Sequence, residues 1–403
     1  MTFTENRIDL DFFGMFCAPS VNEKHPETFF ITAHIKEPVN PTVLQQASDD
    51  LFHRLPFLSG RLSRDKRGFY YEPIREVPQI IPENEPAGFS MYYKQGKGHL
   101  LRVLYAEKYI KVETAHFVID GRGLSKIVNT LLVRYFELLG INADKSGVIN
   151  CDDGFNPEEM EDALVRFSGT YTPRKDKEKL PKSVYKSGYK RSGDTWTLSR
   201  DFSLEKINVK AKSYGLSVTG YLLLEILSVL QEERDFAGNK KPITATLPVD
   251  CRRFFPTETL RNFSYSKNIV LPESAKREQM AQQIKTQFAK IDIAYIQTAV
   301  DELKMALDMF NKMPFRLRNF IIKQSKGLQF KKITFVFSSL GLIKLPKEIE
   351  ARIDSFEFLC SPEEYHPYTF SCISLSNTLT LSVSSVTSDK SMVEKLFEEI
   401  ASN

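Results

Sequence analysis

The stretch from Tyr109 to Gly140 changes from the pattern of a strand to the pattern of a helix within a few residues. Apolar and polar side chains alternate from Tyr109 to Phe117, which is typical of a strand with one buried face. Apolar side chains then recur at helical spacing until Gly140, at Leu124, Ile127, Val128, Leu131, Leu132 and Tyr135. Such a junction lifts the side chains of its turn out of a rigid sheet and into a cleft, where they are available for chemistry.

The turn between the two patterns has the sequence His-Phe-Val-Ile-Asp-Gly over residues 116–121. Histidine is the side chain best suited to accept a proton near neutral pH, so His116 is a candidate general base. Asp120 can hold the turn in place by pairing with a cation. The plainer alternative is a strand-end histidine bonded to a backbone carbonyl, followed by an ordinary Asp-Gly turn.

Helix and strand patterns recur in both halves of the 403 residues, without a detectable repeat. A chain of this length is too long to fold around one ordinary hydrophobic core, so we expect two domains of about 150–200 residues. Residues 174–191 carry eight Lys and Arg against two acidic residues, as a solvated linker does. We therefore predict a first domain over residues 1–172, a basic linker over 173–194 and a second domain over 195–403.

Two segments of the second half are expected to be helical, over residues 274–293 and 300–328. The later one combines an apolar stripe, which includes Met305 and Met309, with basic neighbours such as Arg316 and Lys323. It could form the wall of an acyl or acceptor pocket, or a surface that approaches membranes. The interpretation that we favour is a core-facing helix with a solvated face.

The bulk composition excludes several classes of protein. A hydrophobic content of 42% and a charged content of 26% are those of a globular chain, and a net charge of +4 is too small to indicate nucleic-acid binding. The six histidines lack the spacing of a metal site, and the five dispersed cysteines indicate reduced thiols. No apolar run is long enough to span a membrane, and no secretion signal is visible. We expect a cytoplasmic protein without a transmembrane segment, a metal or a nucleic-acid partner.

Three further segments stand in a fixed order around the His116 turn. Residues 55–62 form an apolar run with a proline that ends in Gly-Arg-Leu. Residues 247–253 read Leu-Pro-Val-Asp-Cys-Arg-Arg and precede an Asn-Phe pair at 262–263, and residues 337–341 read Phe-Ser-Ser-Leu-Gly. Together these segments resemble the superfamily of CoA-dependent acyltransferases with the chloramphenicol-acetyltransferase-like fold. Its members include plant BAHD acyltransferases, peptide-synthetase condensation domains and alcohol acetyltransferases.

The resemblance implies an α/β fold in which two chloramphenicol-acetyltransferase-like domains lie side by side with an active-site tunnel between them. It implies transfer of an acyl group from acyl-CoA to an alcohol or amine, with no bound cofactor and no covalent acyl-enzyme. A phosphopantetheine thioester on an acyl carrier protein is the alternative donor. Because the chain lacks glycine-rich phosphate loops, we expect the donor to enter as an extended pantetheine arm.

The resemblance also assigns roles to charged residues. His116 matches the histidine that removes the proton of the acceptor in the tunnel. Asp120 matches a structural aspartate that forms a salt bridge with an arginine, and Arg252 is the matching partner. Arg253 and Arg61 are the alternative partners. Such an ion pair fixes geometry more than it adds net stability.

The remaining motif residues are small. Gly121 completes the His-x-x-x-Asp-Gly motif. Ser338 and Ser339 stand where the family has a strand-end Ser or Asn close to the developing oxyanion, and one donor there is typically worth about 2.7–4 kcal/mol. The alternative is that both are turn-forming serines before Leu340 and Gly341.

Two departures from the family pattern narrow the resemblance. Condensation domains usually carry a second histidine directly before the catalytic one, where this chain has Ala115. The BAHD sequence Asp-Phe-Gly-Trp-Gly is absent. Both departures favour the alcohol-acetyltransferase branch. Two alternatives stay open: a condensation-like enzyme with a carrier-protein donor, and a non-catalytic binding relative.

Overall fold

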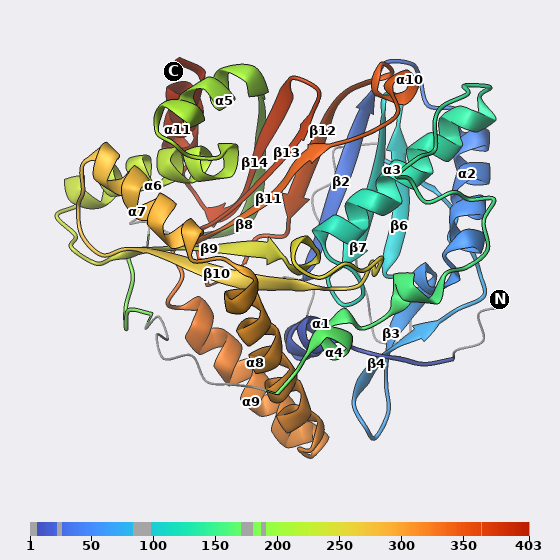
Figure 1. The fold of residues 1–403 in the computed structure, drawn as a ribbon, viewed down its shortest axis with the longest axis horizontal. Helices are drawn as coiled ribbons and strands as arrows, with labels where there is room; N and C mark the ends of the chain where they lie inside the picture. The colour runs from blue at the N-terminus through green and yellow to red at the C-terminus, as the bar shows by residue number, and fades with distance from the viewer. Residues whose placement is uncertain are drawn as a thin grey trace.

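The computed structural model describes residues 6–21, 26–83, 98–170, 180–186, 191–363 and 365–402. The elements form two lobes that lie side by side, each built on one large sheet (Figure 1). The first half contains β1 (Ile8–Asp9), α1 (Phe12–Cys17), β2 (Thr28–Ile35), α2 (Pro41–Arg54), β3 (Gly60–Arg64), β4 (Phe69–Pro73), β5 (Ile81–Pro82), β6 (Leu101–Ala106), β7 (Tyr109–Ala115), α3 (Gly121–Leu138) and α4 (Ala163–Phe167). The predicted mixed α/β fold with two side-by-side lobes is confirmed.

The second half supplies the remaining elements. They are β8 (Arg191–Ser203), α5 (Leu204–Ser213), α6 (Val218–Phe236), β9 (Ile243–Asp250), β10 (Ser264–Leu271), α7 (Arg277–Ala289), α8 (Ile293–Asn311), α9 (Phe315–Phe330), β11 (Phe335–Ile343), α10 (Lys347–Glu350), β12 (Ile353–Cys360), β13 (Tyr368–Leu375), β14 (Thr378–Thr387) and α11 (Ser391–Ser402). Single turns of 3-10 helix lie at Ala18–Ser20, Pro56–Leu58, Pro157–Met160 and Cys251–Arg253.

The sheet of the first lobe has the strand order β12-β2-β7-β6-β5, and α2 and α3 cover one of its faces (Figure 1). Alternation along β7 explains this arrangement, because Ile110 and Val112 belong to the core that the two helices close. Helix α3 begins where the Asp120 side chain accepts a hydrogen bond from the Gly123 N–H, which caps the helix. A smaller sheet, β1-β4-β3, lies beside this lobe.

The sheet of the second lobe has the order β10-β9-β11-β13-β14-β8, and α5, α6, α7 and α11 lie on one side of it (Figure 1). Its helix-facing side is apolar, and buried Phe337 and Phe370 are examples. Serine side chains alternate with that core on the opposite side. Pairing places four serines side by side across four strands: Ser338, Ser371, Ser382 and Ser199.

Strand β12 connects the two lobes. It follows β11 of the second lobe in sequence, yet it pairs antiparallel with β2 of the first, from Ile353 opposite Ile35 to Cys360 opposite Phe29. The predicted boundary at residues 173–194 therefore separates the two sheets except for this strand. Much of the predicted linker, 171–179 and 187–190, lies outside the described residues, and β8 already begins at Arg191.

Helices α8 and α9 form a hairpin that extends away from both sheets (Figure 1). The segment predicted to be helical over 300–328 is divided between two helices, because the chain leaves α8 after Asn311 and Pro314 caps the start of α9 at Phe315. The predicted helix over 274–293 is shorter than expected and ends at Ala289. Among the described residues no single helix is long and apolar enough to cross a membrane, although α5 and α6 together, bent by 80°, have that length and composition.

Candidate active site

His116 lies directly after β7, in the turn that leads into α3. Its backbone N–H donates a 2.9 Å hydrogen bond to the carbonyl oxygen of Glu27, which fixes the end of the strand. The imidazole lies between two phenyl rings, with ring centroids 4.1 Å from Phe13 and 4.7 Å from Phe29. Burial among these groups lowers the pKa of His116 below its usual range, and the opposing effect of Asp120 does not compensate. The imidazole is therefore neutral at neutral pH.

The side chain of Asn262, from the loop before β10, determines which imidazole nitrogen carries the proton. Its amide nitrogen lies 3.3 Å from the backbone carbonyl of His116, which can only accept a hydrogen bond. Its Oδ1 therefore faces His116 Nδ1, at 3.0 Å, and must accept a proton from it. A neutral imidazole with a proton on Nδ1 has its lone pair on Nε2, which is the form that a general base requires.

Asp11 lies behind Asn262 and extends the network. The Asn262 amide donates to both Asp11 carboxylate oxygens, at 3.0 and 3.2 Å, and Asp11 also caps α1 by accepting from the Gly14 N–H at 2.8 Å. Burial raises the pKa of Asp11 to about 7, against the charge of Arg261, whose Nε lies 3.8 Å away. A continuous line of hydrogen bonds thus runs from Asp11 through Asn262 to His116.

Asp120 and Arg252, the predicted ion pair, lie in contact between the lobes, with Arg252 Nη1 2.9 Å from Asp120 Oδ2. The same oxygen accepts from the Phe263 N–H at 3.0 Å, and Oδ1 accepts from the Gly123 N–H at 2.9 Å. Burial alone would raise the pKa of Asp120, but the Arg252 charge and these donors outweigh it, so the pKa lies below its usual range. The carboxylate stays ionised and holds the turn that carries His116.

Arg252 is itself held on several sides. Its Nη1 also lies 3.0 Å from Asp250, and its Nε donates to the Thr259 carbonyl at 2.9 Å. The alternative partners of Asp120 are engaged elsewhere or point away, since Arg61 pairs with Glu72 at 2.9 Å and Arg253 is exposed.

The first turn of α3 lies very close to segments of the second half of the chain. A Cβ at Gly123 would lie 2.1 Å from the carbonyl oxygen of Leu260, and a Cβ at Gly121 would lie 2.8 Å from the Leu340 side chain. Gly121, predicted as part of the motif, therefore lets β11 approach the turn that follows His116.

The two predicted serines of β11 differ in direction. Ser339 Oγ lies 3.0 Å from the Thr219 hydroxyl, on the first turn of α6 in the second lobe. Phe337 is fully buried in the second-lobe core, so Ser338 lies on the opposite face of the sheet. Leu340, two residues further on, packs against the first-lobe core beside Gly121. Ser338 is therefore the serine on the His116 side.

Three contributors to this arrangement were missed in the sequence. Asn262 was recognised only as part of a motif, and Asp11 and Phe13 were assigned no role. The capping position of Asp11 before a short helix was a usable signal for α1, but nothing local indicated its contact with Asn262, 251 residues away.

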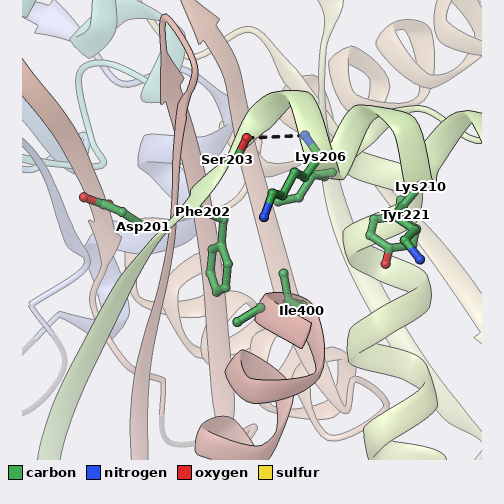
Figure 2. Close-up of a pocket in the computed structure, with 9 residues that line it drawn as sticks. Asp201, Phe202, Ser203, Lys206, Lys210, Tyr221 and Ile400 are labelled. Atoms are coloured by element: carbon green, nitrogen blue, oxygen red, sulfur yellow. Dashed lines mark hydrogen bonds between the residues drawn. The ribbon is translucent and has the colours of Figure 1, made fainter. Parts of the chain in front are cut away.

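Two cavities lie away from His116. One of about 200 Å³ lies between β8, α5, α6 and α11, where Lys206 and Lys210 of α5 stand near Phe202 and Ile400 (Figure 2). The other, of about 550 Å³, lies between α8 and Ser168. The channel expected at His116 stays a prediction. Within the described ranges, no cluster of three or more His, Cys, Asp or Glu side chains could hold a metal ion.

Solved structures share this fold at low sequence identity, although no family model and no curated protein matches the chain. Polyketide synthase associated protein 5 from Mycobacterium tuberculosis aligns with a TM-score of 0.63 and 15% identity over 93% of this chain and 94% of its own. The first condensation domain of the CDA synthetase aligns with a TM-score of 0.63 and 10% identity over 98% and 94%. The condensation domain of the monacolin K polyketide synthase aligns with a TM-score of 0.59 and 10% identity over 99% of this chain and 97% of its own. The chain thus has the two-lobed fold of condensation domains.

Proposed function

We propose that this protein transfers an acyl group from a thioester to a hydroxyl or amine acceptor, with His116 as the general base. The observation that carries the proposal is the contact between His116 Nδ1 and Asn262 Oδ1, because it leaves the lone pair on Nε2. The lowered pKa of His116, caused by burial, supports it further, since the base is unprotonated at neutral pH.

The reaction needs no covalent acyl-enzyme. Nε2 of His116 removes the proton of the acceptor while its oxygen or nitrogen attacks the thioester carbonyl and forms a tetrahedral oxyanion. The carbon–sulfur bond then breaks, and the departing thiolate takes the proton back from the imidazolium. The transient imidazolium is stabilised through Nδ1 by Asn262, whose amide is in turn bonded to Asp11.

Other side chains position these groups. Asp120 is an anchor and not a proton carrier, because Arg252 keeps it ionised. Ser338 is the candidate oxyanion donor, since Ser339 is already bonded to Thr219. A preorganised hydroxyl of this kind typically contributes about 2.7–4 kcal/mol to the transition state.

Acyl-CoA is the donor that we propose, and a carrier-protein thioester is the second candidate. The second candidate is supported by the neighbouring folds, which include condensation domains of the CDA synthetase and of the monacolin K polyketide synthase. Both donors carry the same pantetheine arm and differ only in what is attached to its far end. A cytoplasmic location would suit either donor.

A transfer assay separates the candidates. The purified protein is incubated with acetyl-CoA, longer acyl-CoAs or an acylated carrier protein, and release of free thiol is followed with a panel of alcohols and amines. Release that requires an acceptor and is absent in His116→Ala supports acyl transfer, and the preferred donor decides between the two classes. Absence of any release with all donors, together with donor binding by calorimetry, would indicate a non-catalytic binding relative.

A further inference from the structure

Helix α9 buries two of its cations and exposes three of its large apolar side chains. Arg318 and Lys326 are buried, with 7% and 2% of their surface exposed. Leu317, Phe320 and Leu328 are 49%, 62% and 62% exposed. Ile322 is buried as well, so charged and apolar side chains share the inner face of this helix. Met305 and Met309 of α8 are also about half exposed, at 48% and 50%.

The orientation of α9 is fixed from inside. Arg318 donates a 2.9 Å hydrogen bond to the Arg67 carbonyl at the tip of the β3–β4 hairpin. Lys326 forms a buried ion pair with Glu27, whose carbonyl oxygen holds the backbone of His116. Because leaving either partner buried and unpaired would cost several kcal/mol, the helix cannot simply rotate to hide its apolar side chains.

The outward side of α9 combines apolar and basic residues. Leu317, Phe320 and Leu328 share one side of the helix at its natural spacing, and exposed Arg316 and Lys323 flank them. We call these five residues the α9 surface. Large apolar side chains that gather on an exposed face usually mark a binding surface.

The charged side chains of α9 itself are all basic. Residues 309–332, from the end of α8 to the residues after α9, contain seven Lys and Arg and no Asp or Glu, although the net charge of the whole chain is only +4. Two of these cations, Arg318 and Lys326, are buried, and the acid just before this segment, Asp308, is paired with Lys304 at 2.7 Å. The tip of the β3–β4 hairpin adds exposed Arg64 and Lys66, and it joins α9 through the Phe69 and Phe315 rings, 5.5 Å apart. The acid at this tip, Asp65, is paired with Arg7 at 2.7 Å.

We propose that the α9 surface, together with the tip of the β3–β4 hairpin, binds the surface of an anionic lipid bilayer. Phenylalanine and leucine side chains enter the boundary between headgroups and acyl chains, while neighbouring cations contact lipid phosphates. The hairpin of α8 and α9 projects from the body of the molecule (Figure 1), so it can meet a deformable bilayer without a matching groove. Two copies of a surface so rich in cations would repel one another, which disfavours self-association.

This inference goes beyond acyl transfer and does not rest on it. A bilayer at this surface would, however, affect the side from which molecules can reach the candidate site. Through Lys326 and Glu27, α9 is connected to the strand end that carries His116, so a bilayer bound there would lie on the α9 side of the candidate site.

Vesicle sedimentation with the full chain tests the proposal. Wild-type protein should bind phosphatidylcholine vesicles that contain phosphatidylglycerol, and binding should weaken as salt rises from about 0.1 to about 0.5 M, since exposed charges are screened. Leu317→Ser combined with Phe320→Ser should lower partitioning about tenfold or more, because buried apolar area is lost. Arg316→Glu combined with Lys323→Glu should remove the preference for phosphatidylglycerol. All four positions are exposed, and circular dichroism checks that the fold persists.

Matched controls lie at the end of α6. Phe236, 96% exposed, and exposed Lys240 provide Phe236→Ser and Lys240→Glu, which should leave vesicle binding unchanged. Three results of the vesicle assay would overturn the proposal. The first is that the wild-type protein does not bind phosphatidylglycerol vesicles. The second is that the control variants lose as much vesicle binding as the α9 variants. The third is that the Leu317/Phe320 variant binds vesicles as well as wild type while polyglutamate displaces the protein completely, which would mean that charge alone holds it there. A fall in oligomer size in that variant, measured by light scattering, would instead identify a contact between copies and also overturn it.

Discussion

Nδ1 of His116 lies 3.0 Å from Oδ1 of Asn262, so a side chain of the second lobe orients the imidazole of the first. Asn262 is in turn held by Asp11, which comes from the start of the chain. The geometry of the candidate base therefore depends on three distant parts of the chain, and it forms only when both lobes are in place.

Replacing His116 with alanine tests the candidate base. We expect His116→Ala to lower acyl transfer by about 10²–10⁴-fold, the usual contribution of a general base. The fold should persist, since the Glu27 contact of this residue is made by its backbone. Steady-state kinetics with the preferred donor measure the effect, and thermal unfolding checks the fold. Transfer at the wild-type rate in a folded variant would exclude the mechanism.

Removing Asn262 should change the acid–base behaviour of His116 as well as the rate. Its hydrogen bond to Nδ1 favours the protonated ring, so Asn262→Ala should lower the pKa of His116 further. The acidic limb of the pH profile of kcat/KM should then move to lower pH, with a loss in rate of about tenfold or more. Nitrogen chemical shifts of the labelled imidazole should show loss of the single Nδ1–H tautomer. An unchanged tautomer and pH profile would contradict the assigned role.

Asp11 should make the protein less stable as pH rises. Burial raises the pKa of Asp11 to about 7 in the folded protein, whereas the unfolded carboxyl titrates near about 4. Between these values the folded state binds more protons than the unfolded state, so the free energy of unfolding falls as pH rises from about 4 to about 7. Asp11→Asn should flatten this slope in urea unfolding across that range. Parallel slopes in the two proteins would show that Asp11 does not titrate as described.

The Asp120–Arg252 pair should show unequal single losses and strong coupling. Arg252→Ala leaves a buried carboxylate with only backbone donors, whereas Asp120→Asn leaves Arg252 paired with Asp250. We expect a loss of about 3–5 kcal/mol for Arg252→Ala and a smaller one for Asp120→Asn. The double variant should lose much less than the sum in chemical unfolding, because the two residues share one interaction. Additive losses would show that the pair does not act as a unit.

The pH dependence of the same pair has the opposite sign to that of Asp11. The pKa of Asp120 is lowered in the folded protein, so its contribution is present above the unfolded pKa of about 4 and is lost as pH falls below it. Wild type and Asp120→Asn should therefore converge in stability only in acid.

Gly123→Ala should separate the lobes locally. The added Cβ would lie 2.1 Å from the Leu260 carbonyl oxygen. That oxygen belongs to the backbone, which cannot move aside as a flexible side chain can. We expect a destabilisation of about 1–3 kcal/mol, typical of overpacking, measured by thermal unfolding. Gly154→Ala is the matched control, because no atom lies within 4 Å of its added Cβ. Equal stability of the two variants would mean that the contact is not close.

Local patterns in the sequence were sufficient for the turn around His116. The alternation along β7 and the helical spacing after Gly121 predicted a strand and a helix, and the structure has them at Tyr109–Ala115 and Gly121–Leu138. Arg252 was identified as the neighbour of Asp120 only through the order of motifs in a family, not through any local property.

Contacts between distant segments were beyond local patterns. Periodicity shows that α9 has an apolar side and a charged side, but it does not show which of them faces the protein. In this structure Lys326 faces inward because it pairs with Glu27. Pro314 divides the helical segment that periodicity predicted over 300–328 into two helices. The pairing of β12 with β2 depends on the path of the whole chain.

That pairing has a consequence for how the protein can come apart. A polypeptide that ended after the first lobe would lack β12, and β2 would become an open edge with unpaired backbone groups and several large apolar side chains. Such edges invite pairing with other chains and aggregation. The early part of a growing chain is therefore in need of protection until residues 353–360 emerge, and the two lobes should melt in one cooperative step instead of two.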